Sequence, residues 1–220
     1  MKKFLLSFLM LTLVFFAAAC GEDETTTPEK TTTPDATTPE DDPLDQELAG
    51  AFEDLAVGKE AYITTIGQGE ELDIIWAVME SVFDDAEERN NTIVNDDLLE
   101  PATVEEGAIV FLVVGASSKG MGDAGVDQSA EIARANAFSA RAEAGEITLV
   151  LIHSGGMTRR GTLSDPMIEA AASDAALMLV LISGNEDAFF NDLSDTTDVP
   201  LYLYTNNPAL IPPLKQLFGK

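Results

Sequence analysis

The sequence predicts an α/β domain with a single doubly wound, mostly parallel sheet of flavodoxin-like or Rossmann-like topology. Short apolar segments alternate with segments that suit helices, which is the arrangement of an open sheet with helices on both faces. Three of the apolar segments are continuously apolar, as parallel strands buried on both faces are. We therefore expect the strand order 2-1-3-4-5, with a sixth strand outside.

The expected elements follow from this alternation. Strands are predicted at residues 61–66, 108–114, 147–152, 177–182 and 201–204, with a weaker one at 92–94. Helices are predicted at residues 70–85, 128–145, 166–173, 186–193 and 208–218. Asp165 and Asn207 each precede a proline and are expected to cap the helices at 166–173 and 208–218.

The N-terminus has the pattern of an export signal. Lys2 and Lys3 precede an apolar run over residues 4–19, and the run ends in three alanines followed by Cys20. This ending resembles a bacterial lipobox, so residues 1–19 are predicted to be a lipoprotein signal peptide. Cys20 would then carry the acyl chains, such as palmitate, that hold the protein to membrane lipid. The alternative is an ordinary signal peptide cut nearby, which would leave a free thiol.

Residues 20–45 form a segment of a different composition. They are rich in Thr, Pro, Glu and Asp and nearly lack apolar side chains, so burial cannot offset the entropy of ordering them. We interpret them as a disordered tether between the lipid and an α/β domain at residues 46–220. The predicted location is the bacterial cell envelope, on the extracytoplasmic side of a membrane.

The charge balance excludes several classes of function. The chain has 12 Lys and Arg against 39 Asp and Glu, a net charge of -27, which argues against binding to nucleic acid. One cysteine and one histidine exclude the usual zinc sites, and no motif indicates a cofactor. The acidity itself fits either a saline habitat or an ordinary solvated acidic surface.

Glycine-rich and polar segments follow the predicted strands, where the fold would gather them at one edge of the sheet. Glycine backbone, serine hydroxyls and positive side chains together would suit an anion. Three of the nine basic residues of the domain fall in these loops, beside the lone histidine. The candidate ligand-binding residues are Gln68, Ser117, Ser118, Lys119, His153, Arg159, Arg160 and Asn185.

Structural and catalytic interpretations of the same residues stay open. Each basic side chain could pair with an acid, and His153 could be a satisfied residue at a strand end. Ser117 or Ser118 could act as a nucleophile with Lys119 or His153 as the base. However, the loop matches neither the Gly-x-Ser-x-Gly motif nor a Walker loop.

Two long sequence blocks also resemble a known family. Residues 115–127 read GASSKGMGDAGVD, residues 153–165 read HSGGMTRRGTLSD, and the shorter block at 184–189 reads GNEDAF. They resemble the signatures of an uncharacterised family of bacterial exported or lipid-anchored Rossmann-like α/β domains, a domain of unknown function. The resemblance spans nearly all of residues 58–206 and implies an extracytoplasmic domain with a shared site at Ser117, Ser118, Lys119, His153, Arg159 and Arg160.

The sequence therefore leads to one function and two alternatives. The first expectation is a membrane-anchored domain that binds a small anionic or polar ligand, with binding preferred to catalysis. The alternatives are a hydrolase that uses Ser117 or Ser118 and an envelope module that binds another protein.

Overall fold

The computed structural model describes residues 50, 52–83 and 85–220. The predicted signal peptide, Cys20 and the tether lie outside these residues. Within the part described, no helix is both long enough and apolar enough to cross a membrane.

The centre of the domain is a six-stranded sheet in which every neighbouring pair of strands is parallel. The strand order is β2-β1-β3-β4-β5-β6, which confirms the predicted doubly wound topology with its sixth strand outside. The strands are β1 (Ala61–Ile66), β2 (Ile93–Asn95), β3 (Ile109–Val114), β4 (Thr148–His153), β5 (Leu177–Leu181) and β6 (Leu201–Tyr204).

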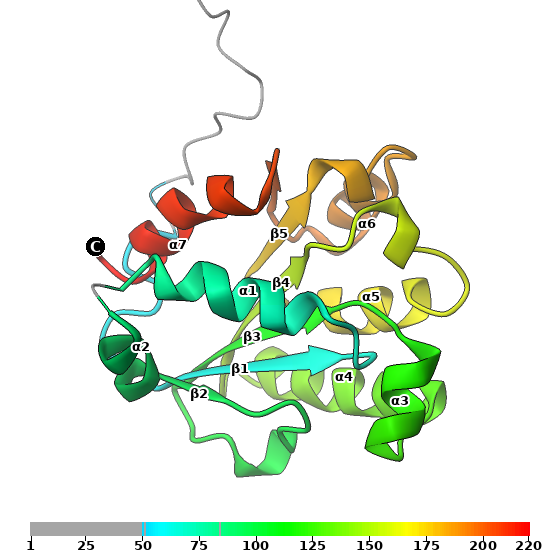
Figure 1. The fold of residues 1–220 in the computed structure, drawn as a ribbon, viewed down its shortest axis with the longest axis horizontal. Helices are drawn as coiled ribbons and strands as arrows, with labels where there is room; N and C mark the ends of the chain where they lie inside the picture. Colours follow the sequence, from blue (N-terminus) through cyan, green and yellow to red (C-terminus); the bar gives the residue numbers. More distant parts are fainter. Residues whose placement is uncertain (1–49, 51, 84) are drawn as a thin grey trace, which may run out of the picture. The chain divides into compact units, whose positions relative to one another are not determined.

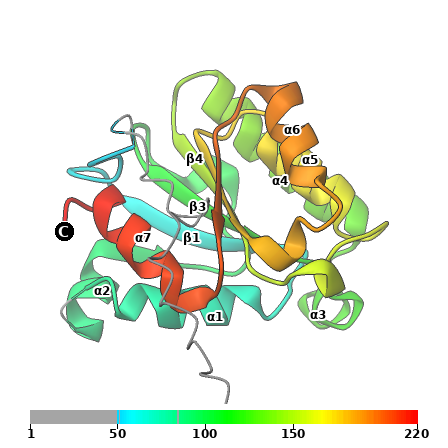
Figure 2. The same cartoon turned by 90° about the horizontal axis from the view of Figure 1, so that it is seen from above.

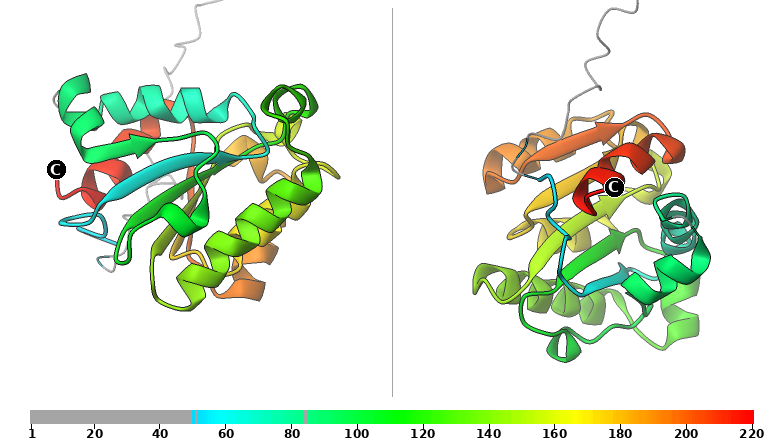
Figure 3. Two further views of the ribbon diagram at one scale, coloured as in Figure 1. Left: turned by 90° about the horizontal axis from the view of Figure 1, so that it is seen from below. Right: turned by 90° about the vertical axis from the view of Figure 1, so that its left-hand side faces the viewer.

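Helices cover both faces of this sheet, as Figure 1 shows. Seen from above, α1, α2 and α7 lie on one side and α4, α5 and α6 on the other (Figure 2), and the view from below shows the same three layers (Figure 3). The α-helices are α1 (Glu71–Glu80), α2 (Ala86–Thr92), α3 (Ser118–Ala124), α4 (Gln128–Glu143), α5 (Asp165–Ala172), α6 (Phe189–Thr197) and α7 (Ile211–Leu217). Short 3-10 helices are η1 (Pro101–Thr103), η2 (Met157–Arg159), η3 (Ile182–Gly184) and η4 (Asn207–Leu210).

The core has two halves because strand side chains alternate between the two faces. Every residue of β1 and β3 is buried. On one face, Phe111 of β3 packs with Ile75 of α1 and Leu214 of α7. On the other, Leu112 packs with Phe138 of α4. Burial on both faces explains why β3 appears in the sequence as an unbroken apolar run.

Helix boundaries differ from the prediction in three places. The helix predicted at 70–85 ends at Glu80, and α2 follows as a separate helix. Residues 118–124, predicted to be loop, form α3. The helix predicted at 186–193 begins only at Phe189 and continues to Thr197.

Two predicted helix caps are wrong. Asp165 is the first residue of α5, and its carboxylate accepts a hydrogen bond from the Gly161 amide at 2.8 Å instead of capping the helix. At the last helical segment the cap is Asn206, whose side chain accepts from the Ala209 amide at 3.1 Å. Pro166 and Pro208 are therefore the second residues of their helical segments, and not the first as predicted.

Candidate functional site

The switch point of the sheet lies between β1 and β3, where the chain direction across the sheet reverses. Here the two strand-end loops bind each other. Gln68 and Ala116 form an isolated antiparallel bridge, and the Ser117 amide donates to the Gly67 carbonyl at 2.8 Å. Gly67 has a φ of +94°, and a Cβ there would lie 2.8 Å from Ala116 Cα. Backbone contacts thus join the two loops that border the usual ligand crevice of this fold class.

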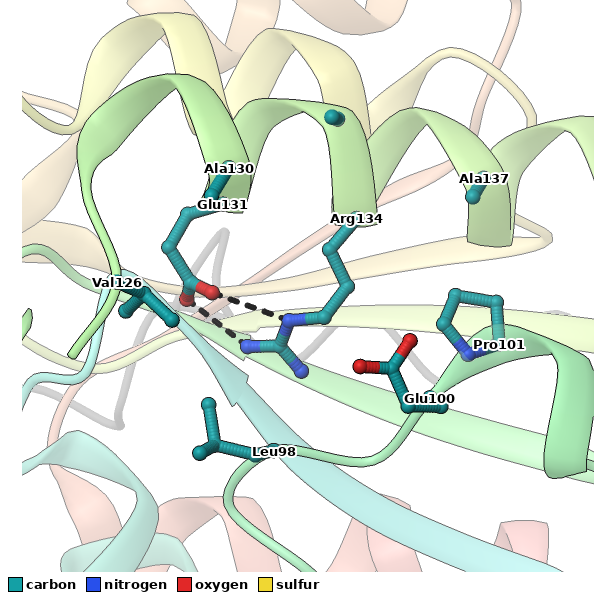
Figure 4. A pocket seen from close by; sticks show the side chains of 9 residues that line it. Leu98, Glu100, Pro101, Val126, Ala130, Glu131, Arg134 and Ala137 are labelled. Atoms are coloured by element: carbon teal, nitrogen blue, oxygen red, sulfur yellow. Dashed lines mark hydrogen bonds and ion pairs between the residues drawn. The ribbon is translucent and has the colours of Figure 1, made fainter. Parts of the chain in front are cut away.

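A buried ion pair of α4 positions the β1 loop. Glu131 accepts a hydrogen bond from the Gly67 amide at 2.6 Å and pairs with Arg134 at 2.9 Å. Arg134 also donates to the Thr64 hydroxyl and to the carbonyls of Thr65 and Leu99. This guanidinium, shown in Figure 4, faces a groove of about 460 Å³ between α4 and residues 98–101. The hydrogen bonds of Arg134 connect the carboxyl end of β1 to α4.

Gln68, a predicted site residue, belongs to this structural network. Its amide Nε2 donates to the Asp97 carbonyl at 3.2 Å and to Glu131 at 3.3 Å. Gln68 also helps to line a polar cavity of about 100 Å³ together with Asp73 and Asp97. None of the predicted basic residues lines this cavity, and its two carboxylates would repel an anion.

Glu71, which was not predicted as a site residue, is the unusual group at this edge. It lies in the first turn of α1, and its side chain is 2% exposed. Its carboxylate fills a niche between three loops. A Cβ at Gly115 would lie 2.6 Å from Glu71 Cδ, one at Gly155 would lie 2.5 Å from its Oε1, and one at Gly69 would overlap its Oε2. Glycine at these positions therefore makes room for a carboxylate.

Neither oxygen of Glu71 accepts a hydrogen bond from any described residue. Buried carboxylates normally have several donors, because desolvation without them costs several kcal/mol. Among the residues that the structure describes, the one close cation is Arg159, whose Nε lies 3.0 Å from Glu71 Oε1 without hydrogen-bond alignment. The two side chains thus neutralise each other, while the hydrogen-bonding capacity of the carboxylate stays unused.

Arg159 lies over this niche. It ends the short helix η2, and its aliphatic part packs against Gly155. Its side chain is 31% exposed, and Nη2 also lies 3.9 Å from Glu70, an exposed carboxylate. Of the three predicted basic residues, Arg159 is the one that both faces the carboxyl edge and remains accessible.

The other two predicted cations have different roles. The Lys119 side chain is 88% exposed and pairs with Asp123 one turn along α3, at 2.6 Å. Arg160 is 3% exposed and donates to Asp165 and to the Gly184 carbonyl, both at 2.7 Å. Its guanidinium also lies 3.7 Å from the ring centre of Phe189. Arg160 therefore ties loops together, and Lys119 points into solvent.

The predicted polar residues are mostly engaged with the backbone. Ser117 caps α3 by accepting from the Gly120 amide at 3.0 Å, and Ser118 is the exposed first residue of that helix. Asn185 accepts from the Phe190 amide at 2.8 Å and so organises the start of α6. These contacts explain the polar residues as parts of turns and helix ends.

His153 is fully buried at the end of β4. Its Nδ1 lies 2.9 Å from the Val114 carbonyl and its Nε2 lies 3.3 Å from the Gly156 carbonyl. Burial lowers the pKa of His153 below its ordinary value, although the two carbonyls act in the opposite direction. Both nitrogens face backbone oxygens, so the ring is not placed to take a proton from Ser117.

The described residues contain no group of three or more His, Cys, Asp or Glu side chains that could hold a metal ion. What the edge offers is an accessible guanidinium above a buried carboxylate. A guanidinium can recognise a carboxylate or phosphate, and a carboxylate without donors can receive an ammonium or hydroxyl group. This chemistry suits binding of a small polar molecule.

These features define a doubly wound α/β domain whose glycine-rich carboxyl edge encloses an acid. The chain belongs to the DUF6305 family, a domain of unknown function, whose family model matches residues 58–218. The expected membership of an uncharacterised family is therefore confirmed. No curated protein and no solved structure matches the chain significantly.

Proposed function

We propose that the domain binds a small polar ligand carrying an anionic group at the carboxyl edge of its sheet, with Arg159 as the group that recognises the anion. The observation that supports this most is the pairing of accessible Arg159 with Glu71, a buried carboxylate that receives no hydrogen bond from a described residue. The described contacts of the Arg159 guanidinium, to Glu71 and to exposed Glu70, leave donors for an incoming anion.

The position of this pair also supports binding. Ligands of open α/β sheets bind beyond the carboxyl ends of the strands, and Arg159 follows β4 at that end. Three glycines there make room for the Glu71 carboxylate beside Arg159. A charged hydrogen bond contributes about 1.5 to 3 kcal/mol, so losing Arg159 would weaken binding roughly 10- to 150-fold.

The test is a thermal-shift screen of small carboxylates, phosphates and sulfates at constant ionic strength. A ligand at about 100 times its dissociation constant would stabilise the fold by about 2.7 kcal/mol. Arg159→Ala should remove the shift, whereas Lys119→Ala, which removes a cation from the same edge, should keep it. The proposal fails if no compound shifts the wild type, or if both variants respond as the wild type does.

The hydrolase alternative has less support from the geometry. Ser117 accepts a hydrogen bond as a helix cap, Lys119 pairs with Asp123, and both nitrogens of His153 face carbonyls. No described base contacts either serine hydroxyl. Turnover of ester or phosphoester substrates that is lost in Ser117→Ala or Ser118→Ala would nevertheless establish the enzyme. A protein partner recovered without any ligand-dependent stabilisation would favour an interaction module.

We further propose that this domain works outside the cytoplasm as a lipoprotein of the bacterial envelope, held to membrane lipid by acylated Cys20. The support is the charged start, apolar run and small residues that end at the single cysteine of the chain. Mass spectrometry of the N-terminal peptide should find lipid on Cys20, and Cys20→Ser should move the protein out of the membrane fraction. An unmodified thiol in the membrane-bound protein would contradict this.

A further inference from the structure

We infer that the ligand of this edge is a zwitterion, a small molecule whose ammonium group binds Glu71 while its carboxylate or phosphate binds Arg159. This inference rests on the proposed function and specifies the class of ligand. It follows from the arrangement of the two side chains, because the niche contains an acid as well as a base.

The first argument is the unused hydrogen-bonding capacity of Glu71. An ionised carboxylate can accept about four hydrogen bonds, yet both oxygens of this 2% exposed side chain receive none from the described residues. The surrounding loops expose glycine backbone toward the carboxylate without donating to it. The donors that would satisfy Glu71 are those of a bound molecule, and an ammonium group provides three together with the matching charge.

The second argument is electrostatic. A simple anion that approached Arg159 would also meet Glu71 at 3.0 Å from the guanidinium and Glu70 at 3.9 Å. The repulsion from Glu71 would be strong because this carboxylate is buried, whereas exposed Glu70 would add less. A simple amine would meet Arg159 in the same way. A zwitterion avoids both penalties, because it replaces the internal ion pair by two ion pairs of the same kind and leaves the net charge unchanged.

The third argument is that the niche can open to admit such a molecule. Glu71 is covered by Arg159, whose side chain is a partly exposed arm of η2. The backbone on either side of η2 contains Gly156 and Gly161, both with positive φ, so the loop includes residues of high conformational freedom. Movement of the Arg159 side chain would break its 3.0 Å contact with Glu71 Oε1 and free that oxygen for another donor.

The experiment compares three matched series of probes by calorimetric titration and thermal shift at constant ionic strength. The zwitterions are glycine, β-alanine and 4-aminobutyrate, which differ in the spacing of their charges. The anions are acetate, propionate and butyrate, and the amines are methylamine, ethylamine and propylamine. Each probe is measured with wild type, Glu71→Gln, Arg159→Ala and the control Lys119→Ala.

The expected result is that at least one zwitterion binds wild type and Lys119→Ala roughly 10-fold or more tighter than its matched anion and amine. In Glu71→Gln, which keeps the size of the side chain, the advantage over the anion should disappear. If this variant does not fold, the comparison of the three series on the wild type still decides.

The contrary results separate the two proposals. If anions bind the wild type through Arg159 as tightly as zwitterions do, the inference is overturned and the proposed anion site stands. If the zwitterion advantage survives in Glu71→Gln, the assigned role of Glu71 is wrong. If no compound of any series binds, the inference is overturned, and the screen of carboxylates, phosphates and sulfates decides the proposed function separately.

Discussion

Substitution of Gly115 by alanine tests whether the glycine niche is built around the Glu71 carboxylate. A Cβ at this position would lie 2.6 to 2.9 Å from three atoms of the Glu71 carboxylate. The backbone of Gly115 is not in the left-handed region, so alanine would strain the side-chain packing and leave the backbone as it is. The carboxylate has little room to move aside, because Gly69 and Gly155 border its other sides.

The expected magnitude combines two opposing effects. Overpacking of a tight site costs about 1 to 3 kcal/mol, whereas replacing glycine by alanine lowers the entropy of the unfolded chain and stabilises by about 0.4 to 1 kcal/mol. The two ranges leave a net destabilisation between about 0 and 2.6 kcal/mol, and because the carboxylate has little room to move we expect Gly115→Ala to lower the free energy of unfolding by about 1 to 2 kcal/mol. In a Glu71→Ala background only the entropic part remains, so the same substitution should be neutral or stabilising.

Urea denaturation measures this double-mutant cycle, followed by circular dichroism or by fluorescence of Trp76, the single tryptophan of the chain. Gly122→Ala in α3 is the control, since a Cβ there meets no atom within 4 Å and alanine favours a helix by up to about 1 kcal/mol. Equal destabilisation by Gly115→Ala with and without the Glu71 side chain would refute the reasoning, because the clash would then be with something else.

Three further predictions concern stability. Burial lowers the folded-state pKa of His153 below its ordinary 6.5, so below about pH 6.5 the unfolded chain binds a proton that the folded chain does not. The free energy of unfolding should therefore fall as the pH drops below about 6.5. Urea titrations at several pH values should show a shallower dependence of this free energy on pH in His153→Gln. Arg134→Met leaves Glu131 as a buried charge without its partner and should lower the free energy of unfolding by about 3 to 5 kcal/mol. In the same assay, Lys119→Ala breaks only an exposed pair with Asp123 and should change this free energy by less than about 1 kcal/mol. The melting temperature should rise with NaCl toward roughly molar concentration as salt screens the repulsion of the acidic chain, and a flat or falling curve would show that the acids are locally compensated.

The sheet was predictable because each of its buried strands reads as a separate apolar run. Helix α3 was missed because two of its seven residues are glycines, which disfavour helices by about 1 kcal/mol each. It forms because Ser117 caps its start, Met121 anchors it in the core and Gly125 ends it in the left-handed region. Capping and tertiary contact outweigh local propensity here.

The site was predictable as a place and only partly as a set of residues. Loop position follows from topology, but the direction of a side chain does not. Arg159 and Arg160 are neighbours, yet one lies over the niche at the edge while the other is enclosed by Asp165, Gly184 and Phe189.

Glu71 carried a readable signal, since it falls on the same helical stripe as Ile75, Val78 and Met79, all of them buried. Glu131 and Arg134 likewise share the stripe of Phe138. An acidic residue on the apolar stripe of a helix is predicted to be buried. Glycines in the neighbouring loops then indicate where space exists for its carboxylate. A scan for charged residues in phase with apolar ones would have identified both buried acids.

The bridge between Gln68 and Ala116 limits the shape of a molecule that could bind at the switch point of the sheet. An elongated nucleotide in a sheet of this kind lies across the gap between the first and third strands, with its phosphates against the first glycine loop. Here that gap is bridged by the protein backbone, and the helix that follows has Glu70 at its N-cap and Glu71 as its first residue. For the ligand that we propose at Arg159, a compact molecule is therefore compatible with this bridge, and a long molecule laid across β1 and β3 is not.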